Sequence, residues 1–308
     1  MTKFRDITAQ PEYDTSFWNA MKGSGVYSET LRGGYVAALG TYKIPNPASE
    51  KILKAIKEES VFRNISTVLR LQKEGGHIIA RNYDDMAQFV PEGGEIPILN
   101  AMADFSDLSV KADKLAVIVK IDEEFVNDAL FDIEKHLTKR LGTAIALAED
   151  NGFINGNGDG EPTGLLNETS GAETGVNTDD LSFDDVLSLY ASVDKKYRRK
   201  AVWLMNDMTA LALRKLKDKD GNYLWNQSND TILGKPVCIS EFMPDIASGN
   251  KPIAFGDFSY YWIIGRLPLS ARPLTERFAT VSQIAYLAFE FIDGKLIRRD
   301  AVKVIKMG

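Results

Sequence analysis

Two adjacent carboxylates are the first residues in the sequence that could do chemistry. Glu149 and Asp150 lie just before a glycine-rich segment, and a pair of acids in a cleft could serve a carboxylate-based hydrolase. Adjacent acids are also the ordinary polar end of a helix, and we favour this simpler interpretation. A hydrolase is therefore the least favoured of three functional hypotheses.

Histidine and cysteine give little support for metal or nucleophilic chemistry. The chain has two histidines, His77 and His136, and a single cysteine, Cys238. Metal sites depend on His and Cys, and a His-based triad needs a placed imidazole. We interpret the histidines as surface or structural residues and the cysteine as a small hydrophobe. We therefore expect no metal, no cofactor, no internal disulfide and no enzymatic activity.

The glycine-rich segment at 153–167 does not match a phosphate-binding motif. The lysine that a P-loop needs is missing, and Glu161 breaks the G-x-G-x-x-G pattern. The spacing of its acids does not fit an EF-hand. We predict a structural loop that closes a helix.

Composition and charge exclude several protein classes. The chain has 308 residues, of which 44% are hydrophobic and 26% are charged, with a net charge of −6. These values are typical of a folded protein and unlike those of a basic, sequence-specific DNA binder. No apolar run reaches the roughly 18 residues of a membrane span, and the first residues lack an apolar signal region. We therefore expect no membrane association and a cytoplasmic site of synthesis.

The strongest helical pattern runs from Asp122 to about Gly152. Apolar residues recur there at steps of three and four and make one stripe. The stripe consists of Val126, Leu130, Ile133, Leu137, Leu141, Ile145 and Ala148. About 30 residues at 1.5 Å each predict a rod about 45 Å long, which would position the other elements.

Two long extended arms, with the turn FVPEGGEIP between them, are predicted over Glu74–Val110. An isolated two-stranded ribbon is only marginally stable in water, so this hairpin needs a surface to lie on. The segment has one basic residue, Arg81, and its charge equals the net charge of the whole chain. Its acids are Glu74, Asp84, Asp85, Glu92, Glu95, Asp104 and Asp107.

We expect the acidic hairpin to lie across a basic surface of a neighbouring copy. The candidate is the terminal stretch KLIRRDAVKVIK (295–306), in which basic residues outnumber the single acid. Apolar side chains at the tip would add a larger, apolar contribution. The candidate contact residues are Phe89, Val90, Pro91, Glu92, Ile96, Ile98, Arg298, Arg299 and Lys303.

Residues 1–44 show no clear periodicity but carry many aromatic side chains. These are Phe4, Tyr13, Phe17, Trp18, Tyr27 and Tyr35. Two interpretations stay open: a frayed terminus, or an arm that buries its rings on another subunit.

A second globular section follows the glycine-rich segment. Ser182 and Asp185 have the spacing of a capping box at the start of a helix. The stretch GDFSYYWIIG (256–265) predicts a strand. Asp293-Gly294 between two apolar runs predicts the turn of a hairpin.

The order of these parts resembles the major capsid proteins of tailed bacteriophages, which have the Hong Kong 97-type fold. No single string is specific, but the order and spacing of several strings match from about residue 35 onward. The strings are FVPEGG, FINGNGDGEPTGLL, WLMN, LKDKDGNYLW, LGKPVCISEFMP and AFGDFSYYWI.

The resemblance implies an α+β fold and four parts. These are an N-terminal arm (1–44), a peripheral domain with the spine helix (45–72, 112–170 and 276–308), an extended hairpin or E-loop (73–111) and an axial domain (171–275). Members of the family form pentamers and hexamers that close into an icosahedral shell around double-stranded DNA, bound without sequence specificity. The resemblance therefore implies self-association, a portal and a scaffolding protein as partners, assembly in the bacterial host cytoplasm and a final location in the virion.

Two departures from the family pattern lead to further expectations. Some members begin with a scaffolding segment that a protease removes, whereas Met1 here begins almost at the arm. The scaffold is then a separate protein, or none is used, or the sequence is that of the mature form. In addition, Glu74–Val110 contains no lysine, so we expect no Lys–Asn isopeptide crosslink and carry over no catalytic glutamate.

An encapsulin-like compartment is the runner-up hypothesis. Encapsulins share the fold and lack the scaffolding segment, which favours them. Their N-terminal part is a cargo-facing helix, however, and 1–44 shows no such periodicity. Packaged DNA would indicate a capsid, and a packaged enzyme would indicate a compartment.

Overall fold

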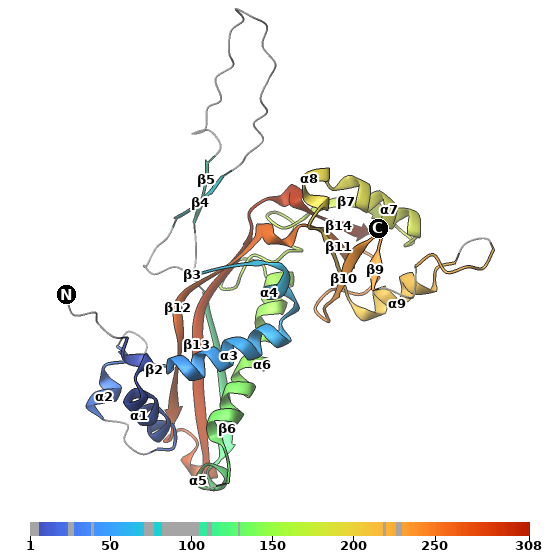
Figure 1. The fold of residues 1–308 in the computed structure, drawn as a ribbon. Coiled ribbons are helices and arrows are strands. Elements are labelled where there is room, and N and C mark those ends of the chain that lie inside the picture. The colour runs from blue at the N-terminus through green and yellow to red at the C-terminus, as the bar shows by residue number, and fades with distance from the viewer. Residues whose placement is uncertain are drawn as a thin grey trace, which may run out of the picture.

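In the part of the chain that the structure describes, two six-stranded sheets and one short strand pair form the framework (Figure 1). The computed structural model describes residues 6–23, 28–37, 40–70, 77–81, 105–109, 113–128, 130–217, 220–225 and 230–308. The first sheet carries the long helices, and the second sheet packs with the shorter ones. A further buried cluster, which includes Ile263 of the first sheet and Leu204 of the second, joins the two.

The first sheet is built on two long antiparallel strands, β12 and β13. Its order is β1 (Tyr35–Val36), β2 (Thr41–Lys43), β12 (Tyr261–Leu274), β13 (Gln283–Leu296) and β6 (Asp113–Asp122), and β3 (Thr67–Arg70) pairs with β12 in parallel. A short helix, η3 (Ala279–Val281), lies in the connection between β12 and β13. Because β12 and β13 each have 14 residues, this part of the molecule is elongated.

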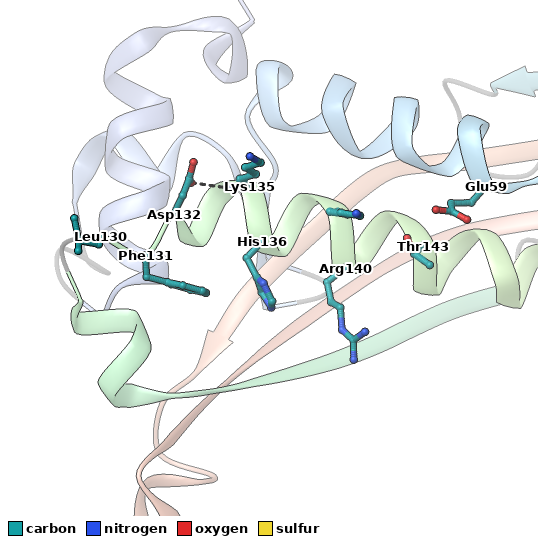
Figure 2. A pocket seen from close by; sticks show the side chains of 9 residues that line it. Glu59, Leu130, Phe131, Asp132, Lys135, His136, Arg140 and Thr143 are labelled. Carbon is teal, nitrogen blue, oxygen red and sulfur yellow. Dashed lines mark hydrogen bonds between the residues drawn. The ribbon is translucent and has the colours of Figure 1, made fainter.

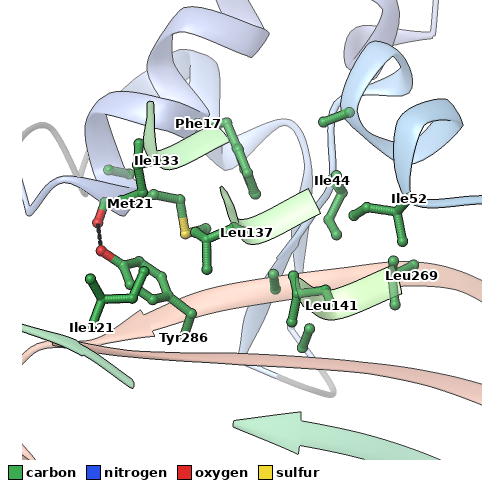
Figure 3. Close-up of a cluster of buried hydrophobic side chains, with 14 of the residues drawn as sticks. Phe17, Met21, Ile44, Ile52, Ile121, Ile133, Leu137, Leu141, Leu269 and Tyr286 are labelled. Carbon is green, nitrogen blue, oxygen red and sulfur yellow. Dashed lines mark hydrogen bonds between the residues drawn. The ribbon is translucent and has the colours of Figure 1, made fainter. Parts of the chain in front are cut away.

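Helices α3 (Asn46–Glu59) and α6 (Ile133–Asn155) lie on one face of this sheet. Their apolar stripes meet β13 in a shared core, drawn in Figure 3. The core includes Ile44, Ile52, Ile121, Ile133, Leu137, Leu141, Leu269 and Tyr286. Burial of this stripe, rather than helix propensity alone, holds α6 on the sheet.

The predicted 30-residue rod is wrong in its first part. The chain forms a short helix, α5 (Glu123–Asn127), and α6 begins only at Ile133. Side chains in between end one helix and start the next: Asp128 accepts a hydrogen bond from the Leu130 N–H at 2.8 Å, and Asp132 caps α6 through the Lys135 N–H at 3.0 Å. Leu130, expected in the stripe, is 93% exposed. The 23 residues of α6 make a rod about 35 Å long.

The N-terminal residues fold on their own chain, which corrects both interpretations of the arm. They form η1 (Ile7–Ala9), α1 (Pro11–Met21) and α2 (Glu29–Arg32). Tyr13 and Phe17 of α1 are fully buried in the core of the first sheet, and the Tyr286 hydroxyl donates a hydrogen bond to the Met21 carbonyl at 3.1 Å (Figure 3). The rings of Tyr13 and Phe17 are therefore neither frayed nor free for another subunit, whereas Tyr35 is 48% exposed and Phe4 and Tyr27 lie outside the described residues.

The second sheet contains parallel and antiparallel pairs. Its order is β7 (Glu173–Thr178), β14 (Val302–Met307), β11 (Ile253–Gly256), β8 (Val202–Met205), β10 (Lys235–Ile239) and β9 (Thr231–Ile232). Helices α7 (Phe183–Ser192), α8 (Lys195–Arg198) and α9 (Asp207–Lys215) accompany it. Its core is centred on Trp203, which stacks on Phe255 with ring centroids 4.1 Å apart. The predicted capping box of Ser182 and Asp185 is confirmed at the start of α7.

Two predictions are wrong in the last part of the chain: the hairpin turn at Asp293-Gly294 and the continuous strand 256–265. β13 continues through Asp293-Gly294 without a turn, because Gly294 serves close packing: a Cβ there would lie 2.5 Å from the Tyr261 hydroxyl. The predicted strand 256–265 is interrupted after Gly256 by η2 (Phe258–Tyr260), which Asp257 caps. A corresponding short helix, η4 (Arg299–Ala301), precedes β14.

The strand pairing places the boundary between the two sheets at different chain positions from the expected domain boundaries. β14 lies in the second sheet, between β7 and β11, although 276–308 was assigned to the peripheral domain. β12 lies in the first sheet, although 171–275 was assigned to the axial domain. Hydrogen bonding across the sheet, which sequence order does not show, decides both placements.

One pair of short strands stands apart from both sheets (Figure 1). β4 (His77–Arg81) pairs antiparallel with β5 (Phe105–Ser109), in the register His77 to Ser109. This pairing agrees with the root of the predicted hairpin. The tip lies outside the described residues.

Candidate functional site

The hairpin tip, which carries most of the predicted contact residues, lies outside the part of the chain that the structure describes. Phe89, Val90, Pro91, Glu92, Ile96 and Ile98 all fall in it. Their role in contacts with another copy stays a prediction.

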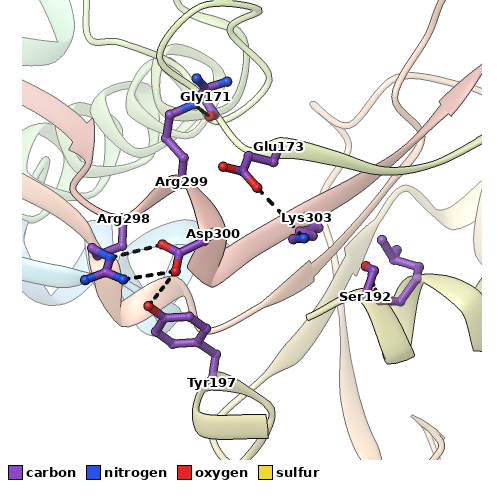
Figure 4. Close-up of polar contacts among 9 residues, drawn as sticks. Gly171, Glu173, Ser192, Tyr197, Arg298, Arg299, Asp300 and Lys303 are labelled. Atoms are coloured by element: carbon purple, nitrogen blue, oxygen red, sulfur yellow. Dashed lines mark hydrogen bonds and ion pairs between the residues drawn. The ribbon is translucent and has the colours of Figure 1, made fainter. Parts of the chain in front are cut away.

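The C-terminal basic stretch is described in full, and its charges have partners within the chain (Figure 4). Arg298 forms a fork with Asp300, with Nε and one terminal nitrogen each 3.0 Å from a carboxylate oxygen. Tyr197 donates a hydrogen bond to the same carboxylate at 2.9 Å. The Arg298 hydrogen bonds hold the pKa of Asp300 below its usual value.

The neighbouring basic side chains also have partners within the chain. Arg299 Nε donates to the Gly171 carbonyl at 2.8 Å, and Lys303 Nζ lies 3.8 Å from a Glu173 oxygen. The side chains of Arg298 and Lys303 are only about a fifth exposed, at 21% and 22%. This stretch therefore stabilises the second sheet, and it offers less free positive charge than its sequence suggests.

The face of the first sheet that α3 and α6 leave uncovered is a different kind of surface. Along β6 the side chains alternate, so that Lys114, Ile118 and Lys120 lie on this face while Leu115 and Val117 pack on the helices. Ile118 is 44% exposed. The part of this face along β6 is exposed, and we call it the open face; it combines an apolar centre with a lysine toward each end of the strand. On the neighbouring strand β13, Phe289 and Ala285 of the same face are buried.

Aromatic rings on the same face hold these lysines. Lys114 Nζ lies 4.4 Å from the centroid of Phe289, and Lys120 Nζ lies 5.4 Å from that of Phe278. A cation over a ring keeps its charge available to an incoming carboxylate while its stem covers apolar surface. The face is therefore suited to an extended, acidic partner with apolar side chains.

A groove of about 550 Å³ runs along the N-terminal half of α6 (Figure 2). Phe131 lies in it, with its ring 5.3 Å from the ring of His136. Lys135, Lys139 and Arg140 follow along the helix. His136 is thus a helix-surface residue, as predicted.

Among the residues that the structure describes, no group of three or more His, Cys, Asp or Glu side chains could hold a metal ion.

The acidic pair Glu149 and Asp150 is buried and serves the fold. Asp150 accepts hydrogen bonds from the Ser60 hydroxyl at 2.5 Å, the Val61 N–H at 2.9 Å and the Phe62 N–H at 3.3 Å. It thereby caps α4 (Val61–Ile65) from another helix. Burial raises the pKa of Asp150, and these hydrogen bonds oppose the rise.

Glu149 binds the guanidinium of Arg63 with both oxygens, at 2.6 Å and 2.5 Å. The Glu149 side chain has no exposed surface, and Arg63 is 11% exposed. Both carboxylates are therefore engaged in structural contacts, which gives no support to a hydrolase. The interpretation of the pair as the polar end of a helix is wrong, because α6 continues to Asn155 and both side chains are buried. Sequence reasoning missed Arg63 and also Glu290, although a single glutamate between Phe289 and Phe291 is a visible signal of a buried acid.

Comparison with known proteins identifies the family. The model of the phage capsid family matches residues 40–307. The chain belongs to the phage capsid family. It is 22% identical over 238 residues to the major capsid protein of Klebsiella oxytoca phage phiKO2, covering 72% of this chain and 55% of that relative. It is 27% identical over 237 residues to the probable major capsid protein gp17 of Mycobacterium phage L5, covering 70% of each. The chain thus spans little more than half the length of the first of these capsid relatives.

Solved capsid structures show the same fold. The capsid of an empty GTA particle superposes with a TM-score of 0.66 at 27% identity, over 81% of this chain and 90% of that one. A virus-like particle from Pyrococcus furiosus superposes at 0.54 with 11% identity, over 84% of this chain and 98% of that one, which is a likeness of fold alone. The predicted mixed fold of the Hong Kong 97 type is confirmed for this capsid-family chain.

None of its helices in the described ranges combines the length and apolar composition needed to cross a membrane.

Proposed function

We propose that this chain is the major subunit of a phage-type capsid and self-assembles into a closed shell. The observation that carries the proposal is the family match over residues 40–307, supported by the likeness to a GTA capsid at 27% identity. Pentamers and hexamers around double-stranded DNA, with a portal and a scaffolding protein as partners, follow as part of the proposal. So do assembly in the host cytoplasm and a final place in the virion.

The two sheets suggest how the parts of such a subunit divide. In this proposal the first sheet with α3 and α6 forms the peripheral domain, with α6 as its spine helix. The second sheet forms the axial domain, and β4 with β5 forms the root of the E-loop. Because β4 and β5 pair only with each other among the described strands, the ribbon gains most of its stability from a second copy.

The surface that receives the hairpin is the open face of the first sheet. The hairpin is acidic and has an apolar tip, and this face presents Lys114 and Lys120 around the half-exposed Ile118. The terminal stretch is the weaker candidate, because Arg299 and Lys303 already have partners in the chain. Exposed ion pairs contribute only about 0.2–1 kcal/mol each, so their main effect is on orientation and assembly rate.

Charge reversal distinguishes this surface from others. The double change Lys114→Glu and Lys120→Glu should slow assembly measured by light scattering, and the difference should shrink at high salt, where charges are screened. The same charge change on α8 and just after it, Lys195→Glu and Lys200→Glu, is the matched control and should assemble normally. Reversing Glu92 and Glu95 to lysine should restore part of the rate. Equal rates for both double variants would remove the open face as the receiving surface.

An encapsulin-like compartment remains the alternative proposal, and one argument against it is gone. The expected lack of an N-terminal helix was wrong, because α1 (Pro11–Met21) is a helix. The family match still favours the capsid. Particles purified after nuclease treatment should contain protected DNA, whereas a compartment would contain a cargo protein and no DNA.

A further inference from the structure

A buried cluster of three charged residues joins three elements of the first sheet's layer. Glu149 comes from α6, Glu290 from β13 and Arg63 from α4. Arg63 donates both of its hydrogen bonds in this cluster to Glu149, at 2.6 Å and 2.5 Å. Glu290 lies beside Glu149, because its strand partner Leu115 lines the same small cavity as Glu149. It is 9% exposed, and its Oε1 is buried without a hydrogen-bond partner.

The number of charges in the cluster does not balance if both acids are ionised. Two carboxylates would then share one guanidinium, and the outer one would be a buried charge with no hydrogen-bond donor on one oxygen. Two carboxyl groups in contact ordinarily keep one proton between them. A proton on Glu290 would let it donate a hydrogen bond to Glu149, since two carboxylates have no hydrogen to donate.

The surroundings offer only partial compensation. The charged groups near Glu290 are Arg63 from α4, Arg70 from β3 and Glu149 from α6. Asp150, also on α6, acts on Glu149, and Asp113 and Lys114 from β6 line a cavity of about 120 Å³ beside Glu149. Burial raises the pKa of Glu290 well above its usual range, and Glu149 raises it further, while Arg63 and Arg70 lower it. The two arginines do not reverse the effect of burial.

We propose that Glu290 and Glu149 share a single proton, and that this proton locks the joint at which α4, α6 and β13 meet. α4 ends at Ile65 and β3 begins at Thr67, two residues further along the chain. β3 in turn precedes β4, the first strand of the hairpin root. The joint therefore fixes the start of the segment that leads to the hairpin, and loss of the proton would loosen it.

The direction of the pH dependence follows from proton binding. Glutamate in the unfolded chain has a pKa of about 4.3, and the folded chain holds the proton to higher pH. Between these two values the folded state binds the additional proton, so the unfolding equilibrium constant rises by at most about tenfold per pH unit. The stabilisation is complete below the unfolded pKa and is lost as the pH rises toward the folded pKa.

The test compares the full-length wild type with Glu290→Gln, which keeps a hydrogen-bond donor toward Glu149 but cannot ionise. Glu123→Gln on α5, an exposed position, is the matched control. Infrared spectra recorded at rising pH should show the carbonyl band of a buried, protonated carboxylic acid persisting above the pKa of ordinary carboxyl groups in wild type and Glu123→Gln, and weakened in Glu290→Gln. The urea concentration at the midpoint of unfolding should fall as the pH rises. This fall should be less steep in Glu290→Gln than in the other two proteins.

A local measurement keeps the inference falsifiable if stability changes for other reasons. Hydrogen exchange of the amides in 61–70, corrected for its intrinsic pH dependence, should accelerate with pH in the wild type and much less in Glu290→Gln. An unchanged infrared band in Glu290→Gln, or identical pH profiles of exchange in both proteins, would overturn the shared proton. The inference rests on the geometry of one chain, so it stands or falls separately from shell assembly.

Discussion

Gly142 of α6 lies against Ala55 of α3 so closely that a Cβ on Gly142 would be 2.6 Å from the Ala55 Cβ and 3.2 Å from the Ile52 carbonyl oxygen. The glycine weakens α6 as an isolated helix, but it allows the two helices to approach. The contact thus decides how α3 packs on α6.

Gly142→Ala should therefore destabilise the protein, although alanine is the better helix former. The gain in helix propensity is about 1 kcal/mol, whereas forcing a methyl group into a tight contact costs about 1–3 kcal/mol. We expect a net loss of about 1 kcal/mol in the free energy of unfolding, measured by urea denaturation. Adding Ala55→Gly should recover part of it. A Gly142→Ala protein more stable than wild type would contradict this contact.

Asp150→Ala should destabilise α4 by about 2–3 kcal/mol, because it leaves a hydroxyl and two backbone N–H groups without their acceptor. Asp150→Asn, which keeps one acceptor oxygen, should lose less. Ser60→Ala removes only one of the hydrogen bonds to Asp150 together with the local cap, and should cost about 1 kcal/mol. Denaturant unfolding at pH 7 checks the order of the three variants. Equal stability of Asp150→Ala and wild type would remove the capping role.

Phe17→Ala should destabilise the unassembled chain by about 3–5 kcal/mol, the usual cost of deleting a buried aromatic ring. Phe17 is 1% exposed within its own chain. Tyr35→Ala, at a position 48% exposed, is the control and should change stability by roughly 0.5 kcal/mol or less. If Phe17→Ala left the free subunit unchanged and weakened only assembly, the ring would belong to an intersubunit arm after all.

Mature particles should dissociate into single chains on denaturing electrophoresis. Glu74–Val110 contains no lysine, so the hairpin has no amine for an isopeptide bond to a neighbour. Boiled particles should give one band at the size of the monomer. A ladder of covalent multimers would contradict the prediction and would require a lysine from another segment.

Local signals predicted local structure well. The spacing of Ser182 and Asp185 predicted the start of α7, and the apolar stripe predicted the length of α6 from Ile133 onward. The sequence analysis does not predict helix α1, although Tyr13, Phe17, Ala20 and Met21 have helical spacing, because aromatic residues near a terminus also fit an intersubunit arm. These four side chains are the buried ones in α1.

Long-range contacts are what the sequence could not show. Asp293-Gly294 has the composition of a turn, but the space beside Tyr261 determines its role. The C-terminal bases form a charged stretch in sequence, yet Arg299 binds the Gly171 carbonyl across 128 positions of the chain. Contacts between residues so far apart in the sequence can be recognised only in the folded structure.

Electron cryomicroscopy of particles formed by the full chain tests the central claim most directly. We predict a closed icosahedral shell in which residues 82–104 of each copy cross the open face of the first sheet in a neighbouring copy, near Lys114 and Lys120. A chain that stays monomeric at high concentration, with those residues packed against its own sheet, would contradict the account.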